Sequence, residues 1–193
     1  YFLDATDKQL IFGLTPFYTL NGEVRIMDFK KGSFWQSNNP SIRSSENINL
    51  SVKITENGQI SGLLRTIKTG YNAFSLRNTL AKTTEEDYLE DYEANNRLEI
   101  NDYKLTGGSN KEQKTTQVFN FNIETTDDDN VNQDEIYFNP FFHERMQTNP
   151  FKLNERLYPV NFGYKRNYTY RANISIPKNY KIAEFPKSKA YKL

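Results

Sequence analysis

Apolar and polar residues alternate along several stretches of this chain, and a period of two predicts β-strands. The clearest stretch runs from Tyr168 to Ile176, where Tyr, Ala and Ile alternate with Thr, Arg, Asn and Ser. Pro177 ends it, because proline lacks the N–H that a ladder needs. The runs 48–54 and 59–69 alternate as well, and Asn57-Gly58 between them is typical of a hairpin turn. The pattern therefore predicts a β-core.

Weaker strand signals stand at residues 1–7, 23–29, 97–105, 115–123, 135–138 and near 180–185. The period becomes helical at Ala73, Leu76 and Leu80, and Thr83 with Glu86 predicts a capping box for a second helix. We therefore expect roughly eight to nine strands, mostly antiparallel, in a mainly β fold. The architecture predicted is an antiparallel β-sandwich with a short two-helix insertion near residues 71–94.

The Ser-, Asn- and Pro-rich loop that holds Trp35 and runs to about Asn47 marks an expected domain boundary. It separates residues 1–46 from a sandwich domain over residues 47–193. No closing strand is expected after Pro186, so this domain is predicted to be truncated at its C-terminus.

Composition narrows the class of protein. Only 36% of residues are apolar, but 15% are aromatic, and large rings bury enough area for a sizeable core. The chain has no cysteine, which excludes disulfides, thiolate nucleophiles and Cys-type zinc sites within it. No apolar run has the length of a membrane span. Residues 152–193 carry ten basic and two acidic residues, but they show no nucleic-acid-binding motif, so no nucleic-acid partner is expected.

Two segments carry a resemblance to a known family. YFLDATD followed by FGLTPFYTLNG resembles the end of a transglutaminase-like catalytic core and its exit segment in large Bacteroidetes proteins. NPFFHERMQTNPFKLNERLYPVNFGY, the strand after it and IPKNYKIAEFPKS are similar to the C-terminal β-sandwich region of those proteins, which is of the DUF3857/DUF3858 type of unknown function. The resemblance implies an accessory domain of a bacterial, periplasmic or cell-surface protein, with the upstream core as its partner.

The same resemblance assigns a role to Asp4. Transglutaminase-like cores use a Cys–His–Asp triad, in which the carboxylate orients the imidazole. The family places this Asp in a segment like LDAT, so Asp4 matches it. The Cys and the His should precede Asp4, and the single histidine, His143, lies far downstream. The resemblance therefore implies a chain that is not itself an enzyme.

An acidic loop offers a candidate metal site. Its alternate residues carry oxygen ligands at the spacing of a calcium loop: Asp128, Asn130, Asn132 and Asp134. Gln133 and Asn139 stand where an EF-hand needs Gly and a bidentate Glu. A solvated acidic loop is the favoured interpretation, and no cofactor is expected.

Each of the remaining candidate catalytic or ligand-binding residues also has a structural interpretation. The acidic residues of 85–93 could serve as paired glycosidase carboxylates, but they fit a solvated helix face better. His143, between two Phe and Glu144-Arg145, is expected to be a packed residue. Arg145 and Arg156 either fix loops or bind a ligand carboxylate. Tyrosines near the last strand either enter the core or form a platform for glycan or peptide, with Phe151 and Phe162: Tyr158, Tyr164, Tyr168 and Tyr170.

The sequence thus predicts a non-catalytic accessory β-domain of a transglutaminase- or protease-like protein, which positions the catalytic core or binds a partner. The alternative is a carbohydrate- or peptide-binding β-sandwich module. A self-contained enzyme that uses carboxylates is the third interpretation.

Overall fold

The fold is taken from a computed structural model. It describes residues 4, 6–20, 22–38, 43–108, 114–123, 135–144, 148–149, 152, 155, 157, 160 and 162–191, with the backbone alone at His143. The strands are β1 (Glu23–Ile26), β2 (Phe34–Ser37), β3 (Ser44–Ile54), β4 (Ile60–Thr69), β5 (Leu98–Thr106), β6 (Lys114–Ile123) and β7 (Arg166–Ser175). The helices are η1 (Phe17–Thr19), α1 (Gly70–Leu80), α2 (Glu85–Asn96) and η2 (Phe142–Glu144).

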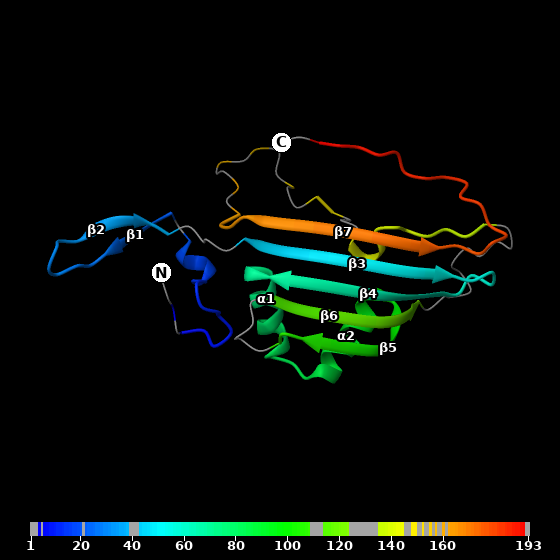
Figure 1. The fold of residues 1–193 in the computed structure, drawn as a ribbon, viewed down its shortest axis with the longest axis horizontal. Helices are drawn as coiled ribbons and strands as arrows, with labels where there is room; N and C mark the ends of the chain where they lie inside the picture. Colours follow the sequence, from blue (N-terminus) through cyan, green and yellow to red (C-terminus); the bar gives the residue numbers. More distant parts are fainter. Residues whose placement is uncertain are drawn as a thin grey trace.

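A five-stranded sheet in the order β5-β6-β4-β3-β7 forms the body of the molecule (Figure 1). The hairpin expected at Asn57-Gly58 joins β3 and β4, and Gly58 adopts the positive φ of 79° that this turn requires. Neighbouring strands are antiparallel except β3 and β7, which are parallel with Ile48 opposite Tyr170. The mainly β, mostly antiparallel fold with two helices is therefore confirmed.

One face of this sheet carries the core. Alternate residues of β3 point to this face, and they pack with apolar residues of the neighbouring strands: Ile48, Leu50, Val52, Ile54, Leu64, Leu98, Phe119 and Phe121. Helices α1 and α2 lie on this face (Figure 1). Tyr92 of α2 stacks on Phe119 at 4.5 Å between ring centres, and Phe142 of η2 stacks on Phe121 at 5.3 Å. The helices thus take the place that a second large sheet would have.

The hairpin of β1 and β2 forms a second, two-stranded sheet, which projects away from the larger one (Figure 1). The segment before it is attached to α1 by a small apolar cluster of Ile11, Leu14, Leu20 and Tyr71. The side chain of Asn38, at the end of the hairpin, is buried and donates to the Thr19 carbonyl at 3.0 Å. The base of the hairpin is therefore fixed to the body.

Two expected strands are absent from the described residues, and most of a third, at residues 1–7, lies outside them. Asp4, Thr6 and Asp7 have no strand conformation, residues 135–138 form only an isolated bridge at Glu135, and residues 176–191 form no strand. Ile136 and Phe138 pack against the core as a covering segment. A turn from the Tyr180 N–H to the Pro177 carbonyl follows β7. Strand β2 stands where a loop around Trp35 was expected, so the described part of the chain holds seven strands, where eight to nine were expected. Residues 180–185 pair with no strand, and Ile182 and Phe185 are 66% and 74% exposed.

Two local expectations also need correction. Helix α2 is capped by Thr84, whose hydroxyl accepts from the Asp87 N–H at 3.1 Å, and not by Thr83. Core burial holds for Tyr170, which packs against the core, but Tyr168 is 53% exposed. Strand β7 is an edge strand, so its side chains are only partly covered.

Candidate functional site

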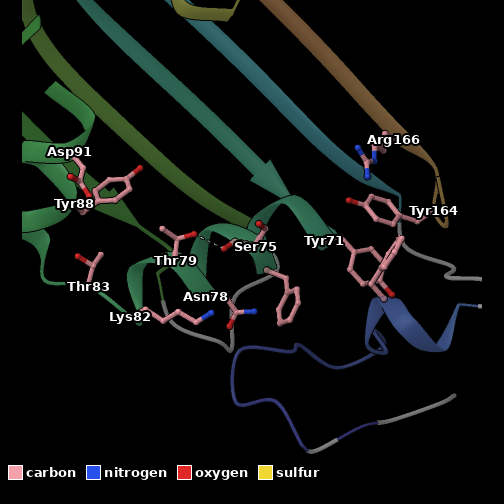
Figure 2. A pocket seen from close by; sticks show the side chains of 12 residues that line it. Tyr71, Ser75, Asn78, Thr79, Lys82, Thr83, Tyr88, Asp91, Tyr164 and Arg166 are labelled. Atoms are coloured by element: carbon pink, nitrogen blue, oxygen red, sulfur yellow. Dashed lines mark hydrogen bonds between the residues drawn. The ribbon is translucent and has the colours of Figure 1, made fainter. Parts of the chain in front are cut away.

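A cleft of about 620 Å³ lies between α1, the first turns of α2, the η1 segment and the residues that lead into β7 (Figure 2). Its floor is one face of α1, with Tyr71, Phe74, Ser75, Asn78 and Thr79. These positions follow the helical period, so their side chains share one face. The opposite face of α1 packs on the sheet through Ala73, Leu76 and Arg77.

The start of α1 is fixed by a close approach to β3. Gly70 has a φ of 57°, and a Cβ there would lie 2.5 Å from the Ser44 hydroxyl, so only glycine fits. The buried Ser44 hydroxyl in turn accepts from the Tyr71 N–H at 2.9 Å. This contact sets the direction of α1 and thereby the place of Tyr71 at one end of the cleft.

A stack of three side chains forms that end of the cleft. The Tyr164 ring centre lies 4.4 Å from that of Tyr71, and the Arg166 guanidinium carbon lies 4.7 Å from it. Figure 2 shows Arg166 on one side of Tyr164 and Tyr71 on the other. Phe17 packs with its ring at 88° to Tyr164, 5.9 Å between centres. Both faces of Tyr164 are thus covered by protein, and its edge faces the cleft.

Gly163 makes this packing possible. Its φ is 71°, and a Cβ there would lie 2.5 Å from the Phe17 ring. The Tyr164 N–H donates to the Phe162 carbonyl across it at 2.8 Å, a tight turn that brings Tyr164 against Phe17. The N-terminal segment and the residues before β7 meet here.

The phenol of Tyr71 ties the N-terminal segment to the site. Its hydroxyl donates to the Thr15 carbonyl at 2.6 Å, and the side chain is almost fully buried. Burial raises the pKa of Tyr71, because the phenolate would lose its hydration. Tyr71 is therefore a neutral donor at neutral pH, and its hydrogen bond holds the cleft wall.

The cleft has charges of opposite sign at its two ends. Arg166 lies at the Tyr164 end, and Asp91 of α2 lies at the other, beside Tyr88 (Figure 2). Lys82 extends from the end of α1 toward Asn78. Lys68 pairs with Glu46 at 3.0 Å, and among the described residues neither Arg166 nor Asp91 takes part in an ion pair.

The structure places some of the residues expected from the sequence and leaves others outside the described part. Tyr164 lies in the cleft, as a platform residue should, although its ring faces are covered. Arg145, Arg156 and Tyr158 lie outside the described residues. The four calcium candidates lie outside them as well: Asp128, Asn130, Asn132 and Asp134. The His143 side chain lies outside the described part of the structure too. Within the described residues, no three His, Cys, Asp or Glu side chains gather as a metal site.

Asp4 is held in a local turn. Its carboxylate accepts from the Thr6 N–H at 2.8 Å and from the Thr6 hydroxyl. These hydrogen bonds lower the pKa of Asp4. The carboxylate is ionised at neutral pH, as an orienting group must be, and its triad role stays a prediction.

Sequence reasoning missed Arg166, Phe17 and the polar face of α1. The helix was recognised from Ala73, Leu76 and Leu80, which point away from the cleft. Tyr71, Phe74 and Asn78, on the cleft face of α1, also follow the helical spacing. This spacing alone does not tell whether a helix face lines a cleft or is simply solvated.

A second surface stands out on the β1–β2 hairpin. Phe29 is 97% exposed, Met27 63%, Trp35 61% and Phe34 48%. The Arg25 guanidinium carbon lies 5.4 Å from the Trp35 ring centre across the hairpin. We call these four apolar residues the hairpin patch.

Comparison with known proteins gives one match. Residues 134–192 match the family described as Domain of Unknown Function with solved-structure structure (DUF3858). The match supports a DUF3858-type domain in this part of the chain. The DUF3858-type residues contain β7, Tyr164 and Arg166, whereas α1 and Phe17 lie before them, so the cleft spans both parts. No curated protein and no solved structure matches the chain. None of the helices in the described residues has the length and hydropathy to cross a membrane.

Proposed function

We propose that this chain is a non-catalytic accessory β-domain of a larger, transglutaminase-like bacterial protein, and that the hairpin patch docks it against the neighbouring domain. The observation that carries this proposal is the exposure of four large apolar side chains on one two-stranded hairpin. Phe34 and Trp35 are successive residues of β2, so the exposed apolar side chains cover both faces of the hairpin. Large apolar side chains gathered on one exposed element mark interaction sites on proteins.

The hairpin is too small to be stable through its own contacts. Strands β1 and β2 pair over four residues each, and isolated two-stranded hairpins are marginal in water. Its base is nevertheless fixed by Asn38, which donates from its backbone to the Gly22 carbonyl and from its side chain to that of Thr19. A fixed base with an uncovered apolar tip fits a docking element.

The transglutaminase-like context rests on the LDAT segment around Asp4 and on the DUF3858-type match. In this proposal the upstream core supplies the Cys and the His, and Asp4 accepts the imidazole N–H. The parent protein would act in the periplasm or at the cell surface. Thiol labelling and amidase assays on the parent protein, with and without Asp4→Asn, test this part. A reactive Cys and a large loss of activity in Asp4→Asn support it, and unchanged activity contradicts it.

Trp35 offers a direct test of docking, since it is the only tryptophan in the 193-residue chain. For this experiment, any tryptophan of the neighbouring domain is replaced by Phe, so that Trp35 alone gives the emission. Docking predicts that Trp35 emission shifts to shorter wavelength and becomes less accessible to iodide in the parent protein than in residues 1–193. Equal quenching in both contradicts docking. A concentration-dependent shift in residues 1–193 alone would instead assign the patch to self-association.

A second candidate function is a ligand-binding module for a peptide or a glycan. The cleft favours it, because aromatic rings and hydrogen-bonding side chains from separate segments converge there, as in small-ligand sites. Isothermal titration of residues 1–193 with peptides and oligosaccharides tests it.

A further inference from the structure

The charges of the cleft indicate what kind of ligand it takes. We propose that it binds an extended peptide of mixed charge, whose carboxylate contacts Arg166 and whose basic side chain contacts Asp91. This inference deepens the second candidate function, that the cleft is a ligand site, and it does not depend on docking of the hairpin patch.

Arg166 is prepared to bind a carboxylate. Its guanidinium lies over the Tyr164 ring, and Tyr71 supports that ring from the other side. Stacking of this kind orients the planar group and leaves its N–H donors free in the plane for a bidentate carboxylate. No carboxylate pairs with Arg166 among the residues that the structure describes.

The other end of the cleft has the opposite sign. Asp91 lies on α2, a helix with several further carboxylates: Glu85, Glu86, Asp87, Glu90 and Glu93. No cation in the described part of the chain pairs with Asp91, and Lys82 extends toward Asn78 instead (Figure 2). Lys82 also lines the cleft, but the six carboxylates of α2 outnumber it, so this end favours a basic group over an acidic one.

The floor between the two ends fits a polypeptide. From Tyr71 to Thr79, α1 rises by about 12 Å at 1.5 Å per residue. An extended peptide covers about 3.3–3.6 Å per residue, so roughly four residues bridge this distance. Ser75 and Asn78 offer a hydroxyl and an amide to its backbone, and the Thr79 hydroxyl, which donates to the Ser75 carbonyl at 3.2 Å, can accept from it (Figure 2).

Peptide is favoured over glycan for two reasons. Peptides carry both signs of charge within a few residues, whereas natural acidic glycans seldom carry a cation. The Tyr164 ring also has no open face on which a sugar could stack, because Arg166 and Tyr71 cover its two faces.

The test uses fluorescein-labelled hexapeptides with blocked termini, measured by fluorescence anisotropy on residues 1–193. One peptide has Glu first and Lys last, one has the reverse order, and one has Gln at both positions, with the same neutral residues between. We expect one charged order to bind at least tenfold more tightly than the other and than the Gln peptide. Arg166→Gln and Asp91→Asn should each weaken that binding about tenfold, a loss typical of a charge-assisted hydrogen bond.

Matched controls lie on the same elements. Arg171→Gln changes an arginine of β7 whose side chain lies on the other face of the sheet, and Glu90→Gln changes a neighbouring carboxylate of α2 outside the cleft. Both should leave the affinity unchanged. The double variant Arg166→Glu/Asp91→Arg should reverse the preference between the two charged orders, a result that misfolding does not produce.

Three results would overturn the proposal. If the Gln peptide binds as tightly as both charged peptides, charge recognition is wrong. If cellohexaose binds the cleft while all peptides fail, the cleft is a ligand site of another class. If neither the peptides nor cellohexaose binds, the second candidate function fails as well.

Discussion

The guanidinium of Arg166 lies 4.7 Å from the ring centre of Tyr164, and this contact joins the start of β7 to the cleft. Both residues belong to the DUF3858-type part of the chain. The ring is held in turn by Tyr71 and Phe17, which come from α1 and from the N-terminal segment. The cationic end of the cleft is therefore built jointly by three segments that are distant in the sequence.

Gly163 is predicted to be the most sensitive backbone position of this junction. Gly163→Ala places a Cβ 2.5 Å from the Phe17 ring and keeps a φ of 71°, so both a clash and backbone strain result. We expect the free energy of unfolding to fall by about 2 kcal/mol or more. Urea denaturation followed by circular dichroism measures it.

The control for this prediction is Gly32→Ala. Gly32 has a φ of 86° but nothing within 4 Å of its Cβ position, so it carries strain without a clash. We therefore expect Gly32→Ala to lower the free energy of unfolding by only about 1 kcal/mol. An equal fall in unfolding free energy for the two variants would show that the close approach of Gly163 to Phe17 does not contribute to stability.

Arg77 is predicted to be essential for packing of α1. It is 1% exposed, and it donates to the Thr115 hydroxyl at 3.3 Å and to the Gln9 carbonyl at 3.2 Å. Burial lowers the pKa of Arg77. Arg77→Lys offers a single ammonium in place of a fork, so we expect a loss of about 2–3 kcal/mol in unfolding free energy.

Arg65→Lys is the matched control for Arg77→Lys, because Arg65 is exposed in β4. Its effect should stay within about 0.5 kcal/mol. A stable Arg77→Lys protein would refute the bridging role of Arg77.

Of the two neighbouring threonines before α2, only Thr84 caps the helix. Thr84→Ala removes the hydroxyl that accepts from the Asp87 N–H, and we expect it to cost about 1 kcal/mol of unfolding free energy. Thr83→Ala should cost little, since Thr83 does not cap the helix. Thermal unfolding of the two variants decides between the caps, and a larger effect of Thr83→Ala would contradict the structure.

Stability is predicted to fall at alkaline pH. Burial raises the pKa of Tyr103 to about 12, and burial, helped by the Glu144 carboxylate, raises the pKa of Tyr170 to about 12, against 10.0 for a free phenol. Between pH 10 and about 12, these two phenols ionise in the unfolded chain but stay neutral in the folded chain. The free energy of unfolding therefore falls as the pH rises. Below pH 10 this contribution to stability is fully present.

Urea midpoints measured from pH 8 to pH 12 test this expectation. Tyr103→Phe should flatten the decline between pH 10 and 12, since one raised pKa is removed. Its hydrogen-bond partner Gln117 keeps a second contact to the Tyr88 hydroxyl at 2.9 Å, so the neutral-pH fold should persist. An unchanged slope would show that Tyr103 does not contribute.

Elements whose signal lies within a short stretch of sequence could be predicted. The β3–β4 hairpin follows from alternation and from Asn57-Gly58, and α1 follows from its apolar period. The sequence predicts the cap of α2 one residue too early, because Thr83 with Glu86 and Thr84 with Asp87 give the same pattern.

Relationships between distant segments could not be predicted in this way. Alternation identifies β7 as a strand, but not its parallel pairing with β3 or its place at the edge, which leaves Tyr168 half exposed. The cleft depends on Gly163 meeting Phe17, a tertiary contact without a signature in the sequence. Of the predicted ligand-binding residues, Tyr164 is the one that the described part of the structure places in the cleft.

Hydrogen exchange of the β1–β2 hairpin tests the accessory-domain account most directly. Amides of residues 23–37 should be compared by mass spectrometry in residues 1–193 and in the parent protein at the same pH and temperature. The account predicts fast exchange in the isolated chain and at least tenfold slower exchange in the parent protein, since docking covers the hairpin patch. Equal exchange rates in the two proteins would contradict it.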